Sequence, residues 1–434
     1  MLGIITLLIA LTTLAAFLVI RLVTKSWQKK PMHIVRIGAF AAFSLLLIAG
    51  VYWWGFRWMG LFVTLAVLAI FSGLYFIRQP KAEKPFKVFA AVRSFISGCI
   101  LVTFCIVPGI LFPQFREVSP TGTYAVATQS VTYVDAARVD PYSEDGENRK
   151  LTVQFYYPSN TENAAAFPLV VFSHGAFGYR GSNLSTYKDL ASNGYVVASI
   201  DHSYHSFFAQ HTDGSRTLVN LDFLNDAVNI TNGEYDGQTA YDKTHAWLAL
   251  RAADMNFVLD EVLGNKSGKL PATLFSLIDS DKIGLFGHSL GGATAAQLGR
   301  MRGDVDAVAV IDGTMFSEET AFENGHAVLT DTPYPVPLLN LYNEEHYTDA
   351  QKEGFAYSNL SASAHAAQAY DVMIRGSGHL NFTDLPLFSP ALAGMLGVGT
   401  VDSRYCIETM NELVLAFFNH TLKGAGELNL KTEY

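Results

Sequence analysis

Lys-Ile-Gly-Leu-Phe-Gly-His-Ser-Leu-Gly-Gly-Ala, residues 282–293, is the stretch that decides the fold of this chain. Residues 283–286 are apolar and predict a buried strand, and residues 293–298 favour helix. Between them Ser289 lies within a Gly-x-Ser-x-Gly pattern, flanked by Gly287 and Gly291. A strand, a tight glycine-flanked turn and a helix predict a nucleophile elbow, which holds a strained serine at a helix N-terminus. The stretch therefore predicts a nucleophilic Ser289 and not an ordinary structural turn.

Such a serine needs a base, and the base needs an acid that orients it. In chains with this elbow, the acid and then the histidine follow the serine in sequence. The next apolar strand, residues 305–311, ends at Asp312, so this carboxylate is expected on the rim of the site. The strand after it, residues 337–342, leads to Glu344, which is a rival for the same role.

The histidine predicted as the base is His379. It follows a short apolar strand, residues 370–374, and the Gly-rich segment Arg375-Gly-Ser-Gly378. Two other histidines compete for this role. His365 lies in an Ala-rich segment that predicts helix, and His346 directly follows two glutamates. Both are interpreted as surface histidines.

A reaction of this kind also needs two backbone N–H donors for the developing oxyanion. The first is predicted at Leu290, directly after the serine. The second is predicted at Ala176, because an apolar strand at residues 167–173 leads into His174-Gly-Ala-Phe-Gly178, which has the composition of a donor loop. His174 precedes Ser289 in the chain, and it is interpreted as a residue that orders this loop.

Four strings of the sequence together resemble the plasma-type platelet-activating factor acetylhydrolases. They are Phe172-Ser-His-Gly-Ala-Phe-Gly-Tyr-Arg180, Gly287-His-Ser-Leu-Gly-Gly292, Ile311-Asp-Gly-Thr-Met-Phe316 and Gly378-His-Leu-Asn-Phe-Thr-Asp384. The resemblance covers the C-terminal two thirds of the chain. It implies an α/β-hydrolase fold and the calcium-independent removal of short or oxidised acyl chains from phospholipids.

The resemblance also implies a role for each matching residue. The resemblance favours Asp312 over Glu344 as the acid. The chain departs from the family pattern at Thr314, where an aromatic residue is usual in the family. The implied roles are nucleophile for Ser289, acid for Asp312, base for His379, and oxyanion donors for Ala176 and Leu290.

The first 115 residues differ in composition from the rest of the chain. Half of all 434 residues are hydrophobic, and the excess lies in four apolar stretches, each near the roughly 20 residues that span a hydrocarbon core. These stretches predict four transmembrane helices, with aromatic residues between the second and third as at a membrane interface. The stretches are residues 2–20, 34–54, 58–77 and 88–112, and the aromatic residues are Tyr52, Trp53, Trp54, Phe56 and Trp58.

Basic residues predict the orientation of these spans, because cytoplasmic loops are rich in lysine and arginine. The second loop has only Arg57, so the first and third loops are expected inside the cell. The hydrolase domain, residues 116–434, is then expected outside a plasma or inner membrane. The basic residues are Arg21, Lys25, Lys29, Lys30 and Arg36 in the first loop, and Arg78, Lys81, Lys84 and Lys87 in the third.

Net charge, cysteine content and one group of polar residues limit the classes of function that the chain can have. A net charge of −9 argues against nucleic acid as a partner, and three cysteines are too few for a disulfide framework. Asp201, His202 and His205 have the residue types of a metal site, but the spacing is weak and neither a metal nor a cofactor is expected. The prediction is a membrane-anchored serine esterase acting on a lipid or small ester. A broad carboxylesterase or lipase, and a non-catalytic membrane sensor, are the alternatives; the oligomeric state is not predicted.

Overall fold

The computed structural model describes residues 2–78, 85–161 and 165–434, and it divides into two compact units. The first comprises residues 1–116 with 387–395, and the second comprises residues 117–386 with 396–434. Lys81 and Lys84, which contribute to the predicted orientation, lie outside the described residues.

The first unit contains four helices that are long and apolar enough to cross a membrane. Helix α1 packs against α4 and helix α2 against α3, and α3 also contacts α4. The helices are α1 (Leu2–Thr24), α2 (Lys29–Ile48), α3 (Phe56–Ile77) and α4 (Val88–Leu111).

Helix α2 departs from the predicted second span of residues 34–54. It begins earlier, at Lys29, and ends at Ile48, because Gly50 adopts a left-handed φ of 72° that ends the helical path. The aromatic residues that follow are divided between two environments. Tyr52 and Trp58 are buried in the core of the bundle, whereas Trp53, Trp54 and Phe56 are exposed. Only the exposed three have the orientation expected of an interfacial aromatic belt.

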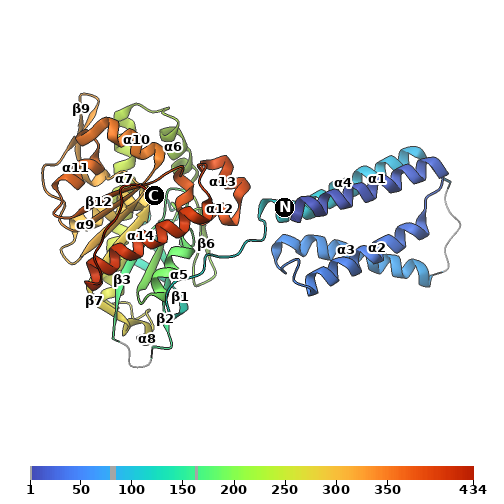
Figure 1. Ribbon diagram of the computed structural model, residues 1–434, viewed down its shortest axis with the longest axis horizontal. Coiled ribbons are helices and arrows are strands. Elements are labelled where there is room, and N and C mark those ends of the chain that lie inside the picture. The colour runs from blue at the N-terminus through green and yellow to red at the C-terminus, as the bar shows by residue number, and fades with distance from the viewer. Residues whose placement is uncertain (1, 79–84, 162–164) are drawn as a thin grey trace. The chain divides into compact units, whose positions relative to one another are not determined.

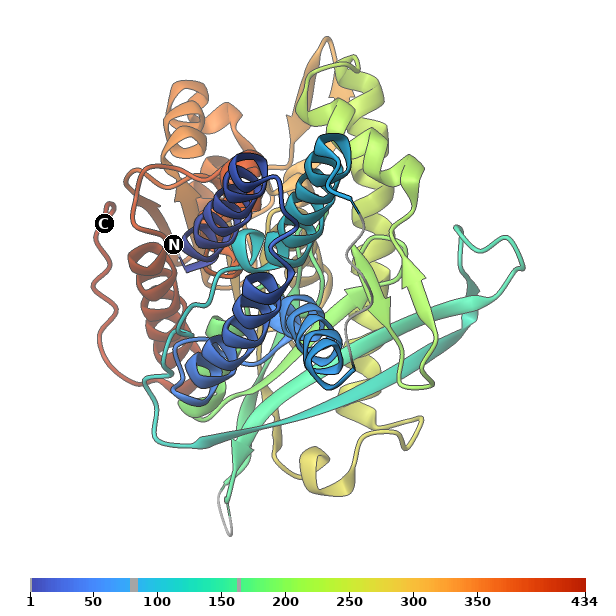
Figure 2. The ribbon, with the colours of Figure 1, turned by 90° about the vertical axis from the view of Figure 1, so that its right-hand side faces the viewer.

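The second unit is built on an eight-stranded sheet with the order β1-β2-β4-β3-β7-β8-β11-β12. The strands from β4 to β12 run parallel in this order, and β1 and β2 add a long antiparallel hairpin at one edge (Figure 2). The strands are β1 (Ala125–Val139), β2 (Asn148–Ser159), β3 (Phe167–Ser173), β4 (Val196–His202), β7 (Ile278–His288), β8 (Ala307–Ile311), β11 (Leu338–Asn343) and β12 (Ala369–Ile374).

Helices cover both faces of the sheet, so the second unit has three layers (Figure 1). Helices α7 and α9 pack with strand residues in one apolar core, and α5 and α14 pack with the other face in a second core. This is the predicted α/β-hydrolase architecture of a mostly parallel sheet flanked by helices. The covering helices are α5 (Leu184–Ser192), α7 (Gly237–Gly264), α9 (Leu290–Met301) and α14 (Ser403–Lys423).

Smaller elements lie in the connections. Residues 202–241 form a short hairpin, one helix and the start of α7. The smaller elements are β5 (Phe208–Gln210), β6 (Arg216–Leu218), α6 (Leu221–Thr231), α8 (Ala272–Phe275), β9 (Glu319–Glu323), β10 (His326–Leu329), α10 (Glu344–Glu353), α11 (Ser358–His365), α12 (Leu385–Phe388), α13 (Pro390–Leu396) and the 3₁₀ turns η1 (Phe316–Glu318), η2 (Gly354–Ala356) and η3 (His379–Phe382).

Candidate active site

Ser289 lies on a strained turn between β7 and α9. Its backbone has φ 56° and ψ −127°, and its N–H donates to the carbonyl of Ile311 on the neighbouring strand at 2.8 Å. A Cβ atom at Gly287 would lie 2.1 Å from the Gly291 oxygen, and one at Gly291 would lie 2.0 Å from the Ser173 oxygen. Both glycines are therefore required by contact with backbone, as the elbow motif predicts.

Asp312 and His379 meet at the same carboxyl edge of the sheet. The Nδ1–H of His379 donates to Oδ2 of Asp312 at 2.6 Å, across 67 residues of sequence. The Asp312 side chain is fully buried, whereas the His379 side chain is 43% exposed and its ring is accessible from solvent. No hydrogen bond joins Ser289 Oγ to the His379 ring among the residues that the structure describes. Such bonds are often long without substrate and tighten when it binds.

The Asp312 carboxylate is held by several donors. Burial by itself raises the pKa of Asp312, but hydrogen bonds from His346 and His379 outweigh it and hold the pKa well below its usual range. Asn343 adds its backbone N–H to Oδ1 at 2.8 Å and its side-chain amide to Oδ2 at 2.6 Å. Asp312 therefore keeps its negative charge throughout the pH range in which histidine titrates.

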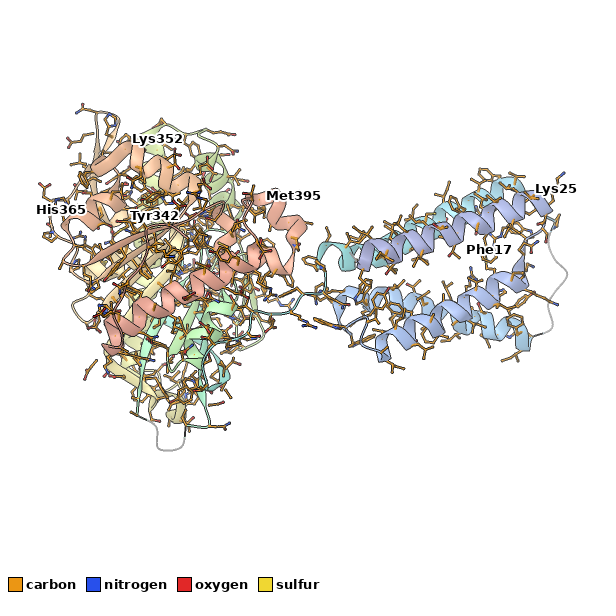
Figure 3. All side chains as sticks on the ribbon, in the orientation of Figure 1. Phe17, Lys25, Tyr342, Lys352, His365 and Met395 are labelled. Atoms are coloured by element: carbon orange, nitrogen blue, oxygen red, sulfur yellow. The ribbon has the colours of Figure 1, made fainter. Side chains whose placement is uncertain are left out.

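The interpretation of His346 as a surface histidine is wrong. Its side chain is only 18% exposed, and Nδ1 lies 2.8 Å from Oδ1 of Asp312. The chain turns back at this point because Asn343 caps α10, its side chain accepting from the His346 N–H at 2.9 Å. His365 is exposed at the end of α11, as expected, and Figure 3 shows it at the outer edge of the second unit. Tyr342, which is also labelled there, is fully buried.

Glu344, the rival acid, has a different partner. Its Oε2 accepts from the backbone N–H of Gly376 at 2.5 Å, in the loop that leads to His379. Glu344 therefore braces this loop, while Nδ1 of His379 is occupied by Asp312.

The two predicted oxyanion donors are both unoccupied. In the described parts of the chain, neither the Ala176 N–H nor the Leu290 N–H has a hydrogen-bond acceptor. Leu290 is the first residue of α9, where a helical N–H has no partner within the helix. His174 orders the other loop as expected, with Nδ1 2.6 Å from the Gly175 oxygen. Its Nε2 lies 2.8 Å from Ser206 Oγ.

Arg251 on α7 also holds the Ala176 loop, and its role is not evident from the sequence. The guanidinium is fully buried and donates to the His174 oxygen at 2.5 Å and to the Gly175 oxygen at 3.4 Å. These carbonyls immediately precede Ala176, so the arginine sets the direction of the Ala176 N–H. This contact arises because α7 packs under the loop, and it joins residues that lie far apart in the sequence.

His288 is a further residue of the site, and it lies within the elbow motif itself. Its Nε2 donates to the His379 carbonyl at 3.0 Å, and the two rings lie 4.6 Å apart between centroids. Burial, reinforced by the nearby His379, lowers the pKa of His288 to about 3. His288 is therefore neutral in the working pH range and anchors the backbone that carries His379.

The residues weighed as a metal site are engaged in hydrogen bonds. Asp201 accepts a hydrogen bond from the backbone N–H of Arg180 and forms an ion pair with the Arg180 guanidinium. His202 and His205 belong to a buried hydrogen-bond network behind the loop that carries Ala176. No group of three or more potential ligands is gathered for a metal ion within residues 2–78, 85–161 and 165–434. The partners are Arg180 for Asp201, Ser173 and Asp254 for His202, and Tyr142 and Arg251 for His205.

Much of the chain is similar to known proteins. The family described as platelet-activating factor acetylhydrolase, isoform II, matches residues 148–431. The platelet-activating factor acetylhydrolase of Bos taurus is 26% identical over 296 residues, which cover 63% of this chain and 61% of the relative. That of Canis lupus familiaris is 26% identical over 275 residues, covering 59% and 57%. The chain thus spans about three fifths of the length of these relatives.

A solved structure is also similar. A ferulic acid esterase from Streptomyces cinnamoneus aligns with a TM-score of 0.55 and 25% sequence identity. The alignment covers 72% of this chain and 95% of the esterase.

Proposed function

Because this chain belongs to the platelet-activating factor acetylhydrolase, isoform II, family, we propose that it is a serine ester hydrolase. The observation that carries the proposal is the bond between Asp312 and His379 on the sheet edge where the strained Ser289 also lies. Its catalytic domain is residues 116–434, and residues 1–115 anchor it in a membrane. The chemistry needs no metal or cofactor.

The proposed reaction has two halves. Ser289 Oγ attacks the ester carbonyl carbon while Nε2 of His379 takes the hydroxyl proton, and Asp312 stabilises the resulting imidazolium. The oxyanion accepts hydrogen bonds from the Ala176 and Leu290 N–H groups. His379 then gives its proton to the leaving alcohol, which departs and leaves an acyl ester on Ser289. Water, deprotonated by His379, attacks this ester; His379 then returns the proton to the departing Ser289 Oγ, which releases the carboxylic acid and restores the free serine.

The proposed substrate class is a short or oxidised acyl ester of a phospholipid. Family membership supports this class, and so does the packing behind the proposed oxyanion donors. Leu290 and Ala176 belong to one apolar cluster with Phe223, Trp247 and Phe316, so large aromatic side chains occupy the space beside the site. A small acyl group suits such a site better than a long one.

A panel of esters tests this substrate class. We expect p-nitrophenyl acetate to be hydrolysed with at least about tenfold higher kcat/KM than the palmitate ester, because a long chain would meet these aromatic side chains. EDTA should leave the rate unchanged. A preference for palmitate would favour a lipase. A preference for methyl ferulate would favour the activity after which the Streptomyces esterase is named, and either result would overturn the proposed class.

We also propose that the hydrolase domain faces the cell exterior, with the basic loops inside. Glu144 and Glu147 are exposed in the turn between β1 and β2, so a glutamate-specific protease added to intact spheroplasts is expected to cut there. A C-terminal tag would report the fragment. Protection of the domain until the membrane is permeabilised would invert the topology and place the substrate on the inner face.

A further inference from the structure

Two histidines share the carboxylate of Asp312, one on each oxygen. His379 Nδ1 lies 2.6 Å from Oδ2, and His346 Nδ1 lies 2.8 Å from Oδ1. A carboxylate oxygen has no proton to give, so both Nδ1 atoms carry hydrogen and both rings are donors. Only one of these histidines is used in the proposed reaction.

The second nitrogen of His346 is also occupied. Its Nε2 is hydrogen-bonded to the Tyr357 hydroxyl, which lies 3.1 Å from Thr314 Oγ1. A neutral imidazole satisfies this arrangement, because Nδ1–H donates to Asp312 and Nε2 accepts from the tyrosine. The result is a hydrogen-bonded chain that runs from Thr314 through Tyr357, His346 and Asp312 to His379.

His346 is held in place from both sides. Its backbone N–H is bonded to Asn343, and its ring lies between Tyr342 and Tyr357 at centroid distances of 5.1 and 5.6 Å. Because Nε2 is engaged with the tyrosine, His346 has no free nitrogen to accept a proton from the serine. It therefore acts on the reaction through Asp312 or does not act at all.

We propose that His346 is a positioning residue for the acid of the triad. This inference rests on the proposed function of the site. The imidazole shares Oδ1 with the backbone N–H of Asn343, and the two donors together prevent the buried carboxylate from rotating and direct Oδ2 at His379 Nδ1. The tautomer and orientation of the base then depend on His346, although His346 touches no substrate.

Replacing His346 in the full-length protein tests this role. His346→Leu keeps most of the side-chain volume but removes the donor, and we expect kcat for p-nitrophenyl acetate to fall about 10- to 100-fold. KM should change less than about twofold, because the substrate site is untouched. His346→Asn places an amide N–H near the position of Nδ1 and should recover most of the lost kcat. His365→Ala is the matched control for loss of an exposed histidine.

Each outcome decides the proposal. An unchanged kcat in His346→Leu would overturn it, and so would a loss that His346→Asn fails to recover, since that pattern indicates packing alone. If the leucine variant does not fold, as judged by its thermal melting, His346→Gln replaces it. Glutamine carries its amide farther from the backbone, so it should be slower than asparagine, and equal rates would contradict the proposal. Failure of the proposed function is distinguishable, because wild-type turnover would then be absent or independent of Ser289.

Discussion

Replacing Ser289 with alanine is expected to lower kcat for p-nitrophenyl acetate by about 10⁶-fold, to the residual rate that the oxyanion donors support. The reason is that the variant has no nucleophile at the one point where the elbow, the helix N-terminus and the donors converge. Alanine is smaller than serine and the position is half-buried, so the fold should be unchanged.

The comparison requires the full chain in detergent, with thermal melting as the control for folding. A Ser289→Ala variant that melts like the wild type and still turns over the ester would remove this serine from the chemistry.

Asp312→Asn is expected to reduce kcat by about 10⁴-fold, because an amide cannot hold His379 in the tautomer that accepts the serine proton. Glu344→Gln is the matched control, since it removes one carboxylate charge at the end of the next strand. Its amide oxygen can still accept from the Gly376 N–H, so we expect a change of less than about threefold.

Steady-state kinetics on the two variants in parallel would show which of the two carboxylates kcat depends on more strongly. If Glu344→Gln were the slower enzyme, the triad acid would have to move to Glu344 and the bond between Asp312 and His379 would need another explanation.

The sequence was sufficient to predict the main elements around the site. Strand β3 has the predicted bounds, and Asp312 and His379 follow strands β8 and β12 as expected. These features are predictable because buried parallel strands are continuous apolar runs, and because their carboxyl ends meet at one edge of the sheet.

The contact between His346 and Asp312 could not be predicted from the pattern of strands. His346 lies three residues beyond a strand end, as a site residue would, but two glutamates before it suggest a solvated surface. Its contact with Asp312 depends on the cap that Asn343 provides, which turns the first residues of α10 back over the sheet edge. An asparagine before two acidic residues is a helix-start signal, and it could have indicated that turn. The bracing of the donor loop by Arg251 depends on tertiary packing and has no comparable local signal.

Labelling with a fluorophosphonate tests the central claim most directly, because this probe forms a covalent bond only with an activated serine. We expect one adduct, on the tryptic peptide Ile283–Arg300 at Ser289, with loss of esterase activity in proportion to labelling. The Asp312→Asn variant should label far more slowly. An active protein that carries no adduct on Ser289, or carries it on another residue, would contradict the account. A protein that neither labels nor turns over any ester would favour a non-catalytic membrane sensor.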